Sequence, residues 1–179
     1  MAKPYYTLET LEAGNSIGFL VKRCGVLMTQ IAERRFEATS VSFIQWMALM
    51  RLCAQAGHMS ATQLSKELGY DMGALTRVVD ELERRGLVRR ERSRRDRRAV
   101  EIAVTSAGRR QADSAKRVIV ELLNELIEPY SDTEIATLIE LMQRMLVRLQ
   151  DTAATSAPAP APVSPIAPTR RKPKSGAAA

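Results

Sequence analysis

The chain has 179 residues, 45% of them hydrophobic, and its 27 Lys and Arg residues against 20 Asp and Glu residues give a net charge of +7. Because no apolar run approaches the roughly 20 residues of a membrane-spanning helix and no secretory leader is visible, we expect one cytoplasmic domain, with or without a tail. With two cysteines, no CxxC spacing and one histidine, the sequence supports no metal site, cofactor or catalytic constellation, so we do not expect an enzyme.

The first predicted helix follows residues 1–12, which show no sustained period and which we expect to form an N-terminal extension. From about residue 15 to residue 36, apolar side chains recur at steps of three and four, which predicts a helix with one apolar stripe. That stripe is long for a helix that only lines the core of its own domain. Its members are Ile17, Leu20, Cys24, Leu27 and Ile31.

The two cysteines both lie in apolar surroundings, Cys24 on this stripe and Cys53 in a later apolar segment. A redox-sensing thiol needs a lowered pKa and access to solvent. We therefore expect both cysteines to be buried and structural, with a sensor role for Cys24 as the alternative.

Three S-x-x-[EQ] pairs precede apolar-periodic segments and predict three helix starts. In this pattern the serine hydroxyl accepts from the backbone N–H of the first turn, and the Glu or Gln side chain accepts from the serine N–H. The predicted helices run roughly from Ser42 to Gln55, from Ser60 to Leu68 and from Ser131 to Gln150.

A further helix is predicted over residues 71–85, with Asp71 as its N-cap and Gly86 as its stop. It follows the helix that ends near Leu68 after a short turn, which is the arrangement of a helix-turn-helix. The second helix of that motif offers its exposed face to the major groove of DNA. On this face we place Gly73, Ala74, Thr76, Arg77, Asp80 and Arg84.

Beyond Gly86 the apolar period shifts to two in LVRRER and again in AVEIAV, which predicts a hairpin with an arginine-rich tip. Helix, turn, helix and hairpin together make a winged helix. Residues 84–98 contain nine arginines against Glu91 and Asp96, so this window carries the net charge of the whole chain. Such concentration favours a surface that binds a polyanion, and a solvated charged face is the alternative.

The predicted helix from Thr105 to about Glu128 ends at Pro129, and the helix after it also carries an apolar stripe. Together with the first helix, these stripes exceed what one small winged helix can cover. We therefore expect a homodimer with a helical interface formed by residues 15–36 and 107–150, with a thicker monomeric core as the alternative.

From Asp151 the composition becomes rich in Ala and Pro and contains six of the eight prolines. We expect residues 151–179 to form a disordered tail, because few large apolar side chains remain to offset the entropy of ordering. Its basic end, TRRKPK, would be a second contact to DNA or would only add solubility.

The stretch DMGALTRVVDELERRGLVRRERSRRDRRAVEIAVTSAG resembles the MarR family of bacterial winged-helix regulators, and the resemblance covers roughly residues 13–150. The most specific parts are the recognition helix, the D-R-R of the wing and V-T-S-A-G-R at the start of the long helix. The resemblance implies a mainly α fold with a small β wing, in which a winged helix-turn-helix lobe is joined to a helical dimerisation region.

The resemblance also implies a homodimer that binds a pseudo-palindromic operator in double-stranded DNA, usually as a repressor that a small phenolic or lipophilic ligand releases. It places Thr76 and Arg77, with the small Gly73 and Ala74, at the major groove. Arg98 would enter the minor groove with Asp96 as its positioning partner, and Arg94 and Arg95 would contact phosphates. Trp46 lies near the position of the family's ligand pocket, although its helical spacing also fits a core residue.

Two other functions remain open on the sequence. The arginine run and the basic tail would also suit a nucleoid-associated protein that binds DNA without sequence preference. A redox-responsive regulator that uses Cys24 would share the fold and differ in its trigger.

Overall fold

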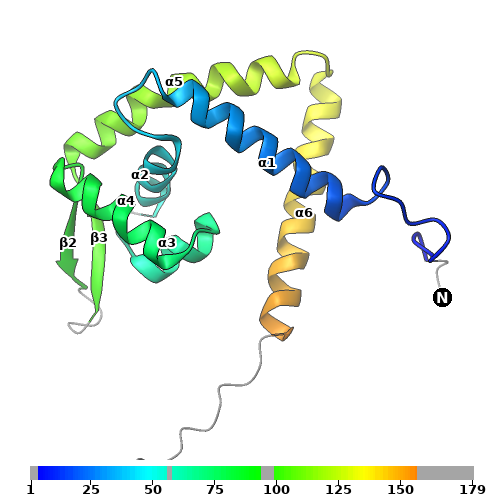
Figure 1. Ribbon diagram of the computed structural model, residues 1–179, viewed down its shortest axis with the longest axis horizontal. Coiled ribbons are helices and arrows are strands. Elements are labelled where there is room, and N and C mark those ends of the chain that lie inside the picture. Colours follow the sequence, from blue (N-terminus) through cyan, green and yellow to red (C-terminus); the bar gives the residue numbers. More distant parts are fainter. Residues whose placement is uncertain (1–3, 56–57, 94–98, 157–179) are drawn as a thin grey trace, which may run out of the picture. The chain divides into compact units, whose positions relative to one another are not determined.

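The computed structural model describes residues 4–55, 58–93 and 99–156, and the chain divides into two units between Pro129 and Tyr130. In the first unit, α2, α3 and α4 gather beside the β2–β3 hairpin (Figure 1). None of the helices in the described ranges combines the length and the hydropathy needed to cross a bilayer. The elements are α1 (Ile17–Phe36), α2 (Phe43–Ala54), β1 (His58–Ser60), α3 (Ala61–Leu68), α4 (Met72–Arg84), β2 (Val88–Arg92), β3 (Val100–Val104), α5 (Ser106–Ile127) and α6 (Asp132–Ser156).

The predicted helix starts are confirmed by their caps. Ser42 and Ser60 each form a complete capping box with the Gln three residues later. The hydroxyl of Ser131 accepts from the N–H of Glu134 at 3.4 Å, and the Ser131 N–H donates to the Glu134 carboxylate at 2.9 Å. Because each box satisfies N–H groups that the first turn leaves free, these short patterns locate the helices well.

The expected boundary of the tail at Asp151 is wrong, since α6 continues through residues 151–156. The physical reason is that Ala153 and Ala154 favour helix. The hydroxyls of Thr152 and Thr155 are satisfied inside the helix, because they donate to the carbonyls four residues earlier. A helix breaker comes only with Pro158. Residues 157–179 lie outside the described part of the chain, and their disorder stays a prediction.

The wing is a three-stranded antiparallel sheet in the order β1-β3-β2. The predicted hairpin is confirmed, with pairs running from Val88 opposite Val104 to Arg92 opposite Val100. Strand β1 was not predicted, because its three residues are too few to show an alternating pattern. It pairs with β3, and Met59 within it is buried.

The hydrophobic core lies between α2, α3, α4, the sheet and the first turns of α5. Its aliphatic side chains come from every one of these elements, so the positions of α4 and the hairpin are fixed by the same packed cluster. Fully buried members are Leu49, Leu52, Leu64, Leu75, Leu82 and Ile102.

The apolar stripe of α1 is exposed, and the prediction that Cys24 is buried is wrong for the single protomer. Leu20 and Leu27, on the same face, are 43% and 42% exposed. The periodicity located the stripe correctly but could not show what covers it. Helix α6 in the second unit likewise exposes a row of apolar side chains, namely Leu138, Ile139, Leu141, Met142, Leu146, Val147 and Leu149.

Candidate nucleic-acid interface

Helices α3 and α4 form a helix-turn-helix with a tight connection. Gly69 caps α3 in the left-handed conformation at φ 68°, which a side chain would disfavour. The Asp71 carboxylate then accepts from the N–H of Ala74 at 3.0 Å and starts α4. The inner face of α4 is anchored by Leu75, Val79 and Leu82, which are at most 1% exposed. The opposite face therefore points out of the lobe.

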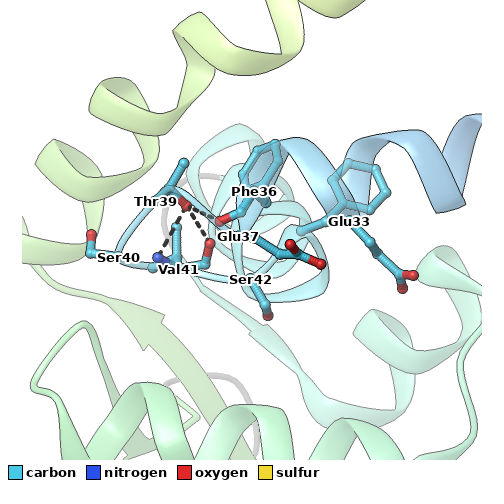
Figure 2. A pocket seen from close by; sticks show the side chains of 8 residues that line it. Glu33, Phe36, Glu37, Thr39, Ser40, Val41 and Ser42 are labelled. Atoms are coloured by element: carbon cyan, nitrogen blue, oxygen red, sulfur yellow. Dashed lines mark hydrogen bonds between the residues drawn. The ribbon is translucent and has the colours of Figure 1, made fainter.

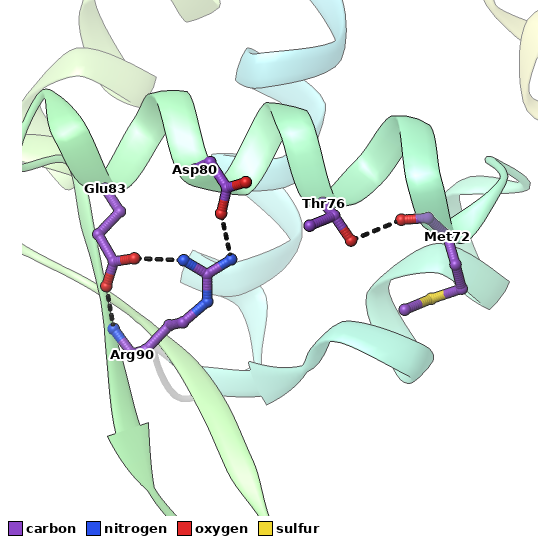
Figure 3. Close-up of polar contacts among 5 residues, drawn as sticks. All are labelled: Met72, Thr76, Asp80, Glu83 and Arg90. Carbon is purple, nitrogen blue, oxygen red and sulfur yellow. Dashed lines mark hydrogen bonds and ion pairs between the residues drawn. The ribbon is translucent and has the colours of Figure 1, made fainter.

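That outer face carries the predicted major-groove residues Gly73, Ala74, Thr76 and Arg77, all of them exposed. The Thr76 hydroxyl donates to the Met72 carbonyl at 2.7 Å within the helix (Figure 3). Arg77 has no ion pair or hydrogen bond to another described side chain. Its guanidinium is therefore available to a ligand outside the protomer.

Among the described arginines of residues 84–92, carboxylates pair with Arg84, Arg89 and Arg90, whereas Arg85 donates to the Gln45 side chain. Arg84 donates to both Glu81 oxygens, at 2.9 and 2.6 Å, and this hydrogen bond lowers the pKa of Glu81. Arg89 pairs with Glu91 on β2. The count of nine arginines therefore overstates the free positive charge of this surface.

Arg90 makes the most contacts of the described arginines in this window, all to α4 (Figure 3). Its N–H donates to Glu83 Oε1 at 2.8 Å, its Nη1 to Glu83 Oε2, and its Nη2 to Asp80 Oδ1 at 2.6 Å. Sequence reasoning missed this cluster. The spacing of seven and ten residues corresponds to no helical or strand period, so only the fold brings these groups together.

The tip of the wing, with the predicted contacts Arg94, Arg95, Asp96 and Arg98, lies outside the described residues. Its base is well defined, because the Ser93 N–H donates to the Ala99 carbonyl at 2.9 Å and the Ser93 hydroxyl to Glu101 at 2.7 Å. These bonds join the two strands of the hairpin next to its tip. The roles of the four tip residues stay predictions.

The V-T-S-A-G-R segment joins the wing to α5. The Thr105 hydroxyl contacts the carbonyls of Gly86 and Leu87, at 2.8 and 3.1 Å, and accepts from the N–H of Gly108 at 3.0 Å. A Cβ on Gly108 would lie 2.1 Å from the Leu87 carbonyl oxygen. The backbone of α5 therefore approaches the start of β2 as closely as only glycine permits.

A pocket of about 260 Å³ lies where α1 ends and α2 begins (Figure 2). Trp46 is not among its lining side chains, but its ring stacks on that of Phe43 at 6.0 Å, and its Nε1 donates to the Ala112 carbonyl at 3.1 Å. Trp46 thus lies outside the pocket and links its lining residue Phe43 to α5. The lining residues are Glu33, Phe36, Glu37, Thr39, Ser40, Val41, Ser42 and Phe43.

Known proteins resemble this chain in sequence and in fold. A sequence profile described as the MarR family matches residues 39–99. An uncharacterized HTH-type transcriptional regulator of Bacillus subtilis (strain 168), YdgJ, is 30% identical over 111 residues, which are 62% of this chain and 68% of that protein.

Two solved structures represent the fold. CouR from Rhodococcus jostii RHA1, bound to p-coumaroyl-CoA, is 29% identical with a TM-score of 0.65, over 76% of this chain and 95% of that chain. A MarR variant from E. coli complexed with operator DNA is 25% identical with a TM-score of 0.62, over 73% of this chain and 93% of that chain. The winged helix-turn-helix of α3, α4 and the β2–β3 hairpin agrees with these similarities, and the chain belongs to the MarR family of transcription regulators.

Proposed function

We propose that the chain acts as a homodimer that places the outer face of α4 in the major groove of a pseudo-palindromic operator and the wing in the adjacent minor groove. The observation that carries this proposal is that α4 has one buried face and one exposed face. Its inner residues are fully buried, while the N-terminal half of the outer face carries the small residues Gly73, Ala74 and Thr76 and the unpaired Arg77. Small residues allow close approach to DNA, and an arginine can make a bidentate contact with guanine. The similar E. coli MarR variant was solved in complex with operator DNA, which supports operator DNA as the partner.

The functional unit of this proposal is residues 13–150, flanked by the extension 1–12 and by the C-terminal segment. The exposed apolar faces of α1, α5 and α6 supply the dimer interface, because a monomer in water would leave them uncovered. Two α4 helices about 34–36 Å apart would then meet consecutive major grooves.

Selection of bound fragments from genomic DNA by the purified full-length protein tests this proposal. We expect the recovered fragments to share a palindrome whose half-sites are about 10 base pairs apart, centre to centre. Recovery without any common sequence would support the nucleoid-associated alternative, in which every duplex binds about equally.

We also propose that a small lipophilic ligand releases the operator by binding the pocket between α1 and α2. Phe36, Val41 and Phe43 give it an apolar wall. Glu33 and Glu37 lie at its edge, and neither has an ion pair with another described residue (Figure 2). Two uncompensated carboxylates repel an anion, so this pocket favours neutral or cationic aromatic compounds over aromatic carboxylates. By linkage, operator binding must lower the affinity for the ligand by the same factor by which the ligand lowers the affinity for the operator.

The single tryptophan makes this preference measurable, because Trp46 stacks on the pocket residue Phe43. In fluorescence titrations, benzyl alcohol should bind at least about fivefold more tightly than benzoate, roughly the 1 kcal/mol of one charge pair in water. Replacing both Glu33 and Glu37 by Gln should close that gap. Glu128→Gln, on an exposed residue outside the pocket, is the control and should leave it open. Equal affinities in the unaltered protein would contradict the proposed pocket chemistry.

A redox-responsive regulator is a second candidate, because Cys24 is exposed in the protomer. In the proposed dimer, however, the partner covers this face, and burial raises the pKa of the Cys53 thiol, which disfavours the reactive thiolate. We therefore expect peroxide to leave operator affinity unchanged. Loss of affinity in the unaltered protein, but not in Cys24→Ser, would establish the redox mechanism instead.

A further inference from the structure

Arg90 lies on β2, an edge strand of the described sheet. In the order β1-β3-β2, β2 lies at the edge of the sheet, and the Arg90 N–H points away from β3 to donate to Glu83. The guanidinium then contacts both Glu83 and Asp80, which are three residues apart on α4 (Figure 3). One residue of the wing is thus held to the recognition helix by its backbone and by its side chain.

We propose that Arg90 is a positioning residue, which fixes the wing to α4 before DNA is bound and does not itself contact a phosphate. This inference rests on the proposed function, in which α4 and the wing enter neighbouring grooves. The two grooves can be engaged together only if helix and wing keep a fixed angle. Arg90 supplies a rigid connection near the end of α4, where the chain has just turned at Gly86.

The charge balance of the cluster argues against a phosphate contact. One guanidinium faces two carboxylates, so moving Arg90 to a phosphate would leave Asp80 and Glu83 uncompensated next to the DNA. The hydrogen bond that Arg90 donates to Asp80 raises the pKa of Arg90, in keeping with a guanidinium held by its partners. The Asp80 carboxylate accepts this bond through Oδ1, so the ion pair offsets its charge next to the DNA.

Arg92 is the matched control. It lies two residues further along β2, on the same side of the strand, is exposed, and has no ion pair among the described residues. Arg90→Gln and Arg92→Gln therefore remove the same charge from the same face, and only the first removes the connection to α4.

The first measurement is hydrogen exchange of the full-length protein without DNA. Glu83→Ala should speed exchange of the residue 90 amide about tenfold, since this N–H loses its acceptor, and Arg90→Gln should speed it relative to its own intrinsic rate. Arg92→Gln should leave it unchanged. Equal protection in all four proteins would overturn the proposal. This arm needs no DNA, so it tests the connection even if the proposed function fails.

The second measurement is operator affinity in a double-mutant cycle. Arg90→Gln should weaken binding about tenfold, and Asp80→Asn with Glu83→Gln should also weaken it, although two negative charges leave the DNA-facing surface. Combining all three substitutions should cost little more than Arg90→Gln alone. If the carboxylate substitutions instead tighten binding to every duplex, and Arg90→Gln adds independently and lowers the salt slope by about 0.9, Arg90 is a phosphate contact and the proposal is wrong.

Discussion

Arg77→Ala is expected to remove roughly 1–3 kcal/mol of the preference for the operator over a mutated operator. Arg77 is an exposed charged side chain on the outer face of α4 and has no partner among the described residues, whereas Asp80 and Arg84 on the same face are in ion pairs. The variant would lose the proposed bidentate pair with guanine O6 and N7 and would keep the proposed contacts to the phosphate backbone. Competition titrations with the two duplexes measure the difference directly.

Arg95→Ala provides the contrast. If the wing arginine contacts phosphate, its loss should weaken all duplexes about equally and reduce the salt slope by about 0.9, without changing the preference for the operator. The same uniform loss for both variants would show that the division into a base reader on α4 and a backbone contact on the wing is incorrect.

Gly108→Ala is expected to lower the free energy of unfolding by about 3 kcal/mol, at the upper end of overpacking effects. The new Cβ would lie 2.1 Å from the Leu87 carbonyl oxygen and 2.9 Å from Val104 Cγ2. Neither the backbone of Leu87 nor the buried Val104 can move without disturbing the Thr105 hydrogen bonds that attach the wing to α5. Urea unfolding at constant protein concentration measures the loss.

Gly18→Ala is the control for this substitution. A Cβ at Gly18, inside α1, meets nothing within 4 Å, so alanine should stabilise the helix by up to about 1 kcal/mol. If Gly108→Ala unfolded at the same urea concentration as the unaltered protein, the close approach of α5 to the wing would be incorrect.

Local signals in the sequence located most elements. Helix starts are set by the capping boxes at Ser42 and Ser60 and by the Asp71 cap, and a helix stop by the positive φ of Gly86. Each of these signals involves only a few neighbouring residues, so a short stretch of sequence is enough to predict the helix end. The end of α6 was predicted too early, because the change in composition at Asp151 does not stop a helix. The first helix breaker after it is Pro158, and α6 continues to Ser156.

Features that depend on distant residues escaped prediction. Strand β1 exists only because β3 lies beside it, and the Arg90 cluster requires α4 and β2 to be folded together. Periodicity placed Cys24 on an apolar face but could not show whether that face is buried, since burial depends on what packs against it. The outer face of α4 was predictable, because its opposite, apolar face is periodic.

The most direct test of the central claim compares the affinity of the full-length protein for its selected operator with that for a scrambled duplex of the same composition, at physiological salt. A dimer that reads DNA with α4 and the wing should prefer the operator about a thousandfold or more. Equal affinity for both duplexes, or no binding to either in dilute buffer, would contradict it.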